Sequence, residues 1–386
     1  MQKSDILLHL GENNSENYLA GSPTIYQTSN FLFDTVEQMR EALAKEDEIP
    51  FYSRGTNPTN TLLNNKVAAL EGTEAALSLA SGSAAIAAAI MANVNQGDHI
   101  LSVTKPYSWS AKLMKNLLPR FRVETTFAEG KDAESFLQNV KNKTKLIFLE
   151  SPNSWTYEMQ DIEAIADFAK KRGIVTVIDN SYASPINQTP ADYGIDIIVH
   201  SATKYLNGHS DIVGGMLCAS SSMVRKIFQS EYMTLGALLS PHDAWLMIRS
   251  LRTLPLRIEH IGNSANEIVA ALEDHPKIKK LYYPHSKTFD QKELVKKYLK
   301  GKSGLFTIDL ATTHPAKIEA FANRLKMFRL GCSWGSYESL AFPAITTASS
   351  LNYDNPDIVR ERVRFSVGLD DSQSLLNDIE NALSVM

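Results

Sequence analysis

The sequence predicts an α/β fold, with a mostly parallel sheet in a large domain and a smaller α+β domain at the C-terminal end. Between Gly97 and Ala219, short apolar strand-like segments alternate with helical segments, which is typical of an open parallel sheet. At 386 residues the chain is long enough for both domains and for a large buried core. Polar residues follow two of the strands, and open sheets bind ligands at the carboxyl ends of their strands.

The composition excludes several classes of protein. Apolar residues make up 44% and charged residues 21%, as in an ordinary soluble globular protein. The net charge of -4 does not favour nucleic acid or an anionic membrane. The N-terminus lacks the apolar stretch of a signal peptide, and the longest apolar run, 84–92, is too short to span a bilayer. Cys218 and Cys332 are the only cysteines and lie far apart, so we expect a cytoplasmic protein without a metal site.

Residues 1–50 are expected to form an N-terminal arm, because they lack the apolar periodicity needed to close a core of their own. One short helix is predicted over 35–45. A loop follows, and Pro58 at its end is expected to begin a helix that runs to Leu70. Tyr52 and Arg54 in this loop are either a surface pair or a phenol and a guanidinium that face a phosphate.

Residues 51–245 are expected to form the large domain. An alanine-rich helix is predicted from Ser81 to about Val94, with Gly82 and Ser83 in its first turn. Small residues at the start of a buried helix form an anion site, although simple N-capping by Ser81 also explains them. The alternating segments that follow are strands at 99–103, 122–126, 145–150, 174–179, 195–199 and 216–219, and helices at 107–117 and 162–171.

Two polar residues follow successive strands in this domain. Asp179 ends the strand 174–179, and Lys204 lies between small residues just after the strand 195–199. Separately they would be a helix cap and a surface lysine. Together they favour pyridoxal-phosphate (PLP) chemistry, which needs a lysine that forms a Schiff base, a carboxylate for the pyridine nitrogen and a phosphate cradle. The chain has no Gly-x-Gly-x-x-Gly after a strand, which disfavours a nicotinamide oxidoreductase.

Residues 246–386 are expected to form the small domain. A helix over 243–251 leads into it, and the pattern then predicts helices at 258–272, 315–325 and 372–383 and a strand at 305–310.

Nine motifs in order along the chain resemble a known family. They are residues 52–59, 81–85, 150–152, 178–180, 201–205, 208–211, 249–254, 333–340 and 364–369. From about Tyr26 to the C-terminus the chain resembles the PLP-dependent enzymes of cysteine and methionine metabolism, the transsulfuration group. This resemblance implies the aspartate-aminotransferase fold (fold type I) with a mostly parallel seven-stranded sheet.

The resemblance also implies how the cofactor is bound. Lys204 is expected to hold PLP covalently and then to move protons, and Asp179 to pair with the pyridinium. Tyr107 is expected to stack on the ring and to assist catalysis. The phosphate is expected to be bound by Gly82, Ser83, Ser201 and Thr203, and by Tyr52 and Arg54 of a neighbouring subunit.

Substrate and assembly follow from the same resemblance. Arg364 is expected to bind the substrate α-carboxylate, assisted by Ser333, with Trp334 and Tyr52 also bordering the substrate. The implied substrate is an amino-acid thioether. Because Tyr52 and Arg54 would serve a neighbouring site, we expect a homotetramer, built as a dimer of dimers that share active sites.

The reaction is predicted from positions at which the group varies. Cys332 stands where γ-acting members often have a glutamate, and Trp334 resembles bacterial cystathionine β-lyases. Ser154 also departs from the γ-acting pattern, and the segment 107–109 lacks the cysteine of methionine γ-lyases. In contrast, the segment 57–59 is more typical of the γ-acting branch.

We therefore predict β-elimination of cystathionine to homocysteine, pyruvate and ammonia. The alternatives are a cystathionine γ-synthase or γ-lyase, an O-acyl-homoserine sulfhydrylase, and a catalytically silent regulatory protein of the same fold. The intact residues Lys204, Asp179 and Arg364 disfavour the last of these.

Overall fold

The large sheet is seven-stranded and mostly parallel, as predicted. The computed structural model describes residues 1–12, 18–347 and 359–386. The strand order is β1-β7-β6-β5-β4-β2-β3; β7 runs antiparallel to β1 and β6, and the other neighbours pair in parallel. The strands are β1 (Ala75–Leu79), β2 (His99–Val103), β3 (Glu124–Ala128), β4 (Thr144–Glu150), β5 (Val175–Asp179), β6 (Ile197–Ser201) and β7 (Gly215–Ala219).

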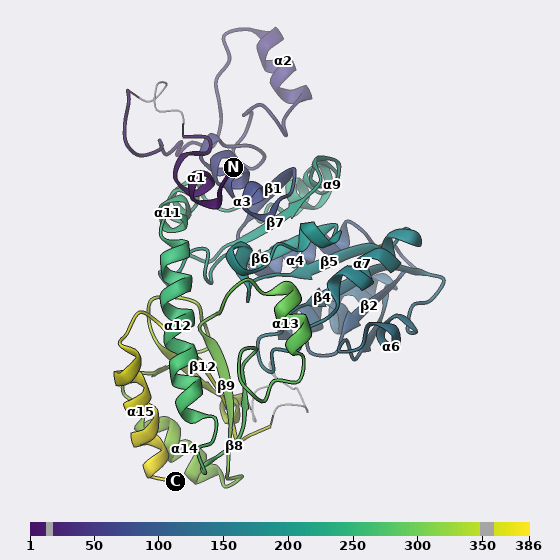
Figure 1. The fold of residues 1–386 in the computed structure, drawn as a ribbon. Coiled ribbons are helices and arrows are strands. Elements are labelled where there is room, and N and C mark those ends of the chain that lie inside the picture. The colour runs from purple at the N-terminus through teal and green to yellow at the C-terminus, as the bar shows by residue number, and fades with distance from the viewer. Residues whose placement is uncertain (13–17, 348–358) are drawn as a thin grey trace.

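Helices cover both faces of this sheet (Figure 1). Along β4, Leu146 and Phe148 pack in the same apolar cluster as α4, whereas Ile147 and Leu149 pack in the cluster that contains α7. This alternation is the two-residue period of a strand buried on both faces. The helices are α3 (Pro58–Glu71), α4 (Gly82–Met91), α5 (Ser108–Lys112), α6 (Ala133–Leu137), α7 (Ile162–Lys171), α8 (Ser184–Asn187), α9 (Ser221–Ile227), α10 (Met233–Leu235) and α11 (Pro241–Leu251).

Helix starts follow the local sequence chemistry. The Asn57 side chain accepts a hydrogen bond from the Thr59 N–H at 3.0 Å and Pro58 occupies the first turn, so α3 begins where predicted. The Ser81 hydroxyl accepts a bond from the Ala84 N–H at 3.0 Å and caps α4. Beyond α5 the chain continues in a π-helical turn at Leu113–Leu117.

Two predicted strands are shifted by two residues. Arg122 has φ +60°, a left-handed conformation that ends the preceding turn, so β3 begins only at Glu124. The strand predicted over 195–199 is β6, which begins at Ile197 and extends to Ser201 because Ser201 pairs with Gly215.

The second sheet belongs to the C-terminal part of the chain. Its order is β10-β11-β12-β9-β8, and α12, α14 and α15 share one apolar cluster with it. The long helix α12 (Leu254–Leu272) connects this region to the large sheet (Figure 1). The remaining elements are β8 (Ile278–Tyr282), α13 (Lys292–Tyr298), β9 (Leu305–Leu310), α14 (Pro315–Arg324), β10 (Arg329–Leu330), β11 (Leu340–Pro343), β12 (Arg362–Ser366) and α15 (Ser372–Ser384).

The N-terminal segment has one anchored part and one projecting part. Helix α1 (Lys3–His9) lies against α3, where the buried Lys66 amine donates to the carbonyls of Ile6 and Leu7 at 3.0 and 3.1 Å. Helix α2 (Val36–Ala44), predicted over 35–45, stands away from the body (Figure 1). Leu32, just before this helix, and Val36, its first residue, are 90% and 71% exposed. Across the described residues, no helix is both long and apolar enough to cross a membrane.

Candidate active site

Several predicted site residues of the large domain lie at one edge of the sheet. Asp179 is the last residue of β5 and Ser201 is the last residue of β6. Glu150 ends β4 in register with Asp179. The residues two positions earlier in these strands, Phe148, Val177 and Val199, pack on the α4 face of the sheet. Because side chains two positions apart in a strand share a face, Glu150, Asp179 and Ser201 also point to the α4 face.

Lys204 lies just beyond β6 and is half-buried. Its amine donates a hydrogen bond to the Ser333 hydroxyl at 2.9 Å and lies 5.5 Å from the centroid of the Trp334 ring. Burial first, and the nearby Arg364 guanidinium second, lower the pKa of Lys204 to about 8. A substantial fraction of this amine is therefore neutral near pH 8, and only a neutral amine can attack an aldehyde.

Asp179 presents a carboxylate that is fixed on one side. Its Oδ1 accepts bonds from the Ser181 N–H at 2.9 Å and the Ser181 hydroxyl at 2.6 Å, while Oδ2 has no hydrogen-bond partner among the described residues. Burial raises the pKa of Asp179, and the bonds from Ser181 and the charges of His200 and Lys204 oppose this rise. A protonated ring nitrogen would supply the cation that such a buried carboxylate needs.

The start of α4 approaches the sheet edge so closely that only glycine fits. A Cβ atom on Gly82 would lie 2.8 Å from the Cα of Ser201, and one on Gly215 would lie 2.1 Å from the carbonyl oxygen of Ser81. The first N–H groups of a helix have no partner within the helix. With the exposed Ser83 and the half-buried Ser201 beside them, these N–H groups form a cradle suited to a phosphate.

Thr203 is already engaged with the protein. Its hydroxyl accepts a bond from the Gly214 N–H at 3.0 Å and lies 3.3 Å from the Gly214 carbonyl oxygen. These bonds hold the chain between β6 and β7 beside Lys204. The geometry gives Thr203 a role in shaping the loop, and its contact with a phosphate stays a prediction.

The small sheet supplies the residues opposite Lys204. Arg364, on β12, is 6% exposed and donates to the carbonyl of Ser154 at 3.2 Å and of Cys332 at 3.0 Å. The Trp334 ring, 7% exposed, packs edge-to-face on Tyr205 with ring centroids 5.3 Å apart. Arg364, Ser333 and Trp334 are therefore brought close to Lys204 from the C-terminal part of the chain.

Three other predicted site residues, Tyr107, Tyr52 and Arg54, do not lie at the strand ends with Asp179 and Ser201. Tyr107 directly precedes α5 with its side chain 42% exposed, and its N–H donates to Glu150 at 2.5 Å. Tyr52 and Arg54 lie in the loop between α2 and α3, where the guanidinium is 5.6 Å from the tyrosine ring centroid. Within the described residues these two side chains make no contact with Lys204 or Asp179. Their service to a neighbouring subunit stays a prediction.

Two residues of the site were not given a role by the sequence prediction. Ser181 fixes Asp179, and Glu150 lies beside it as a second buried carboxyl group. Burial and the neighbouring Asp179 raise the pKa of Glu150 to about 8. A signal was present, because Glu150 ends a strand one step along the sheet from Asp179.

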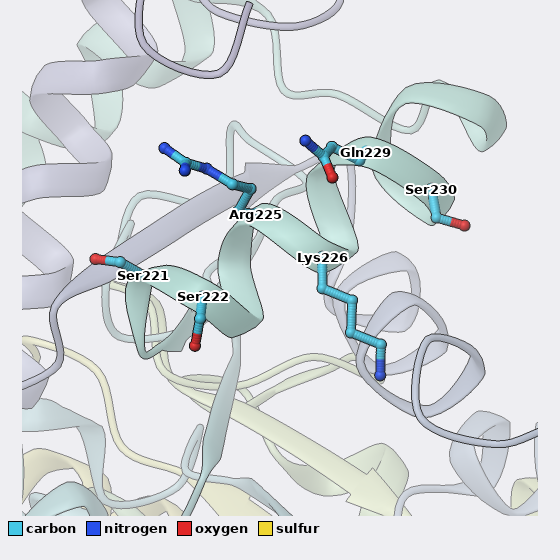
Figure 2. Close-up of a pocket in the computed structure, with 6 residues that line it drawn as sticks. All are labelled: Ser221, Ser222, Arg225, Lys226, Gln229 and Ser230. Atoms are coloured by element: carbon cyan, nitrogen blue, oxygen red, sulfur yellow. The ribbon is translucent and has the colours of Figure 1, made fainter. Parts of the chain in front are cut away.

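A separate surface hollow lies on α9 and the turn that follows it (Figure 2). Figure 2 shows Arg225 and Lys226 pointing in opposite directions from this helix. Arg225 pairs with Asp47 and Glu48, each at 2.6 Å, and Lys226 donates to Asn93 at 3.0 Å. These cations are already partnered, so the hollow is not a second candidate site.

Comparison with known proteins agrees with this geometry. The family model "Cys/Met metabolism PLP-dependent enzyme" matches residues 4–384. The chain is 35% identical to a cystathionine gamma-lyase from Bacillus subtilis, covering 99% of both chains. It is 35% identical to an L-methionine gamma-lyase from Fusobacterium nucleatum, covering 93% of this chain and 92% of the relative.

Two further similarities cover the whole chain. An L-alanine/L-glutamate racemase from Wolbachia pipientis is 33% identical over 100% of this chain and 97% of its own length. The crystal structure of metB from Corynebacterium glutamicum superposes with a TM-score of 0.92 at 28% identity, covering 100% of this chain and 98% of the other.

Proposed function

We propose that this chain, which belongs to the Cys/Met metabolism PLP-dependent enzymes, is a carbon–sulfur lyase that cleaves cystathionine at Cβ. The products would be homocysteine, pyruvate and ammonia. The observation that carries the proposal is the position of the Lys204 amine, 2.9 Å from the Ser333 hydroxyl and 5.5 Å from the Trp334 ring centroid.

The residues present fit the cofactor of the family. Lys204 would hold it covalently, Asp179 would face its ring nitrogen, and the cradle at Gly82, Ser83 and Ser201 would hold its phosphate. When bound, PLP withdraws electrons from the substrate Cα and so makes the Cα proton removable.

Substrate orientation is the task of Arg364. Its guanidinium is held by two backbone carbonyls and lies over the Trp155 ring at 4.8 Å from the centroid. A planar guanidinium binds a carboxylate with two parallel hydrogen bonds, which fixes both position and rotation. An α-carboxylate bound there would direct the substrate Cα towards Lys204.

Proton transfer is the task of Lys204. Because burial lowers the pKa of its amine to about 8, the neutral form is available at moderate pH to take the Cα proton. The hydrogen bond to Ser333 restrains the direction of this amine. The ammonium that results can return a proton, and such general acid–base help contributes about 10²–10⁴-fold to a rate.

The restraint on Lys204 supports β-elimination over γ-elimination. Loss of a group at Cβ needs one proton taken from Cα, whereas loss at Cγ needs a second proton taken from Cβ and therefore a base that moves along the substrate. Ser333 and the buried Trp334 limit that movement. The γ-lyase alternative is supported by the relatives that carry γ-lyase names at 35% identity.

The keto acid formed from cystathionine separates the two reactions. We expect pyruvate together with homocysteine from the purified holoenzyme, and no product from the Lys204→Ala variant. If 2-oxobutyrate and cysteine appear instead, the chain is a γ-lyase and the proposed reaction is wrong.

A second candidate reaction is suggested by the racemase relative, which is similar over the whole chain. Removal of the Cα proton by Lys204, followed by delivery of a proton to the opposite face from a second acid group, would interconvert L- and D-amino acids. Incubation with L-alanine or L-glutamate, followed by chiral chromatography, tests this directly. Racemisation faster than cystathionine cleavage would make the lyase the minor activity.

A further inference from the structure

Glu150 is a buried carboxyl group at the site to which the reaction as described assigns no task. It ends β4, is 5% exposed and lies in register with Asp179. Two backbone N–H groups donate to it, those of Tyr107 at 2.5 Å and Ser154 at 3.2 Å. Each bond goes to a different oxygen of the carboxyl group, so the side chain joins two separate loops.

The first loop carries the aromatic ring of the site. Tyr107 directly precedes α5, and the bond from its N–H to Oε2 of Glu150 fixes the backbone at the start of that helix. The position of the Tyr107 backbone decides how far its ring lies from the strand ends, where the cofactor would bind. The Glu150 bond supplies that restraint from β4.

The second loop carries the support of the substrate-binding arginine. The Ser154 N–H donates to Oε1 of Glu150, and the carbonyl of the same residue accepts a bond from Arg364 at 3.2 Å. Two hydrogen bonds therefore connect Glu150 to the guanidinium. A shift of Ser154 would move one of the two carbonyls that orient Arg364.

We propose that Glu150 is a positioning residue that sets Tyr107 and Arg364 at the same time, one with each carboxyl oxygen. The inference rests on the proposed function, in which Tyr107 faces PLP and Arg364 binds the substrate carboxylate. A carboxyl group suits this task because both partners are donors and each of its oxygens has a lone pair that can accept a bond, the hydroxyl oxygen of the protonated form included. An amide at this position has only one acceptor.

Two variants and one matched control test the proposal. Glu150→Met keeps the length of the side chain and removes both acceptors, and Glu150→Gln keeps one acceptor. The control is Thr176→Val on the same sheet. Thr176 is 0% exposed and bonds to Asp196 at 2.8 Å, near the opposite end of β5, so the control also loses a buried hydrogen bond.

Two affinities are measured, neither of which needs turnover. The first is the Kd of the cofactor-free protein for PLP, read by visible absorbance. The second is the ratio of holoenzyme affinities for glycine and for methylamine, which isolates the contribution of the carboxylate. We expect Glu150→Met to raise the Kd for PLP about tenfold and to lower the glycine-to-methylamine ratio about tenfold, because both donors lose their partner.

Glu150→Gln should impair one of the two affinities, and Thr176→Val should change neither. The proposal is overturned if Glu150→Met leaves either quantity at the value of the Thr176→Val control. If Glu150→Met does not fold, the test rests on Glu150→Gln. The proposal is then overturned if this variant has the wild-type Kd for PLP and the wild-type glycine-to-methylamine ratio. Formation of 2-oxobutyrate from cystathionine would contradict the proposed β-elimination. It would not affect the test of Glu150, because neither the PLP affinity nor the glycine-to-methylamine ratio depends on which bond is broken.

Discussion

In the proposed reaction the amine of Lys204 carries the chemistry, and its reactivity depends on the surroundings that lower its pKa to about 8. As pH rises through this value the amine loses its proton and becomes a nucleophile. We expect the rate at which cofactor-free protein captures PLP to rise with pH and to level off above about pH 8, as stopped-flow absorbance can follow. Free lysine, measured under the same conditions, corrects for the titration of the cofactor itself. A rate that rises in parallel with that of free lysine up to pH 10 would show that burial does not tune this amine.

Single residues also show the limits of sequence reasoning. Asp179 and Lys204 could be predicted because each follows a strand, and strand ends meet at one edge of a parallel sheet. Arg364 and Ser333 could not be placed by that argument, since Ser333 is 129 positions beyond the lysine it contacts. They were predicted from the family resemblance alone, and the structure brings both to Lys204.

At the scale of elements, the close approach of α4 to β6 forms the cradle that we propose for the phosphate. A Cβ at position 82 would lie 2.8 Å from backbone and side-chain atoms of Ser201, so the helix would have to move. Overpacking of this kind costs about 1–3 kcal/mol. We expect Gly82→Ala to raise the Kd for PLP roughly tenfold or more, measured by absorbance titration.

The matched control for that variant is Gly21→Ala, because a Cβ at Gly21 would meet no atom within 4 Å. Its Kd for PLP should equal that of the wild type. An unchanged Kd in Gly82→Ala would mean that the close packing at Ser201 does not shape the cofactor site.

Elements with strong local periodicity were predicted well, whereas the strand β1, whose local sequence is a poor strand former, was not. The helix over 162–171 and the strands over 99–103 and 305–310 have the predicted bounds. The strand β1 was not predicted, because the segment 75–79 contains two alanines and a serine and has little intrinsic strand preference. It becomes a strand by pairing with β7, which lies some 140 residues later and cannot be inferred from local sequence.

At the scale of the whole molecule, the N-terminal arm (residues 1–50) leaves apolar side chains of its projecting part uncovered. Helix α2 stands apart from the body (Figure 1). Tyr52 and Arg54 lie in the loop that follows it along the chain. We propose that this arm packs on a second copy of the chain and completes its phosphate site, within a homotetramer. Exposure of Leu32 and Val36 at 90% and 71% supports an apolar contact there.

Mixing two inactive variants tests the shared site. Lys204→Ala and Arg54→Ala would each be inactive or strongly impaired alone. After denaturation and joint refolding in equal amounts, half of the dimers would contain one copy of each variant, and each of these would have one intact site. We expect recovery of about one quarter of the wild-type activity. If mixing gives no more activity than the separate variants, Arg54 acts within its own chain or not at all.

The most direct measurement is chemical trapping of the cofactor on the intact holoenzyme. Reduction with borohydride, followed by proteolysis and mass spectrometry, identifies the side chain to which PLP is attached. The site described here requires the modification on Lys204 and its absence from the Lys204→Ala variant. Modification of a different lysine in the wild-type protein, or of none, would contradict it.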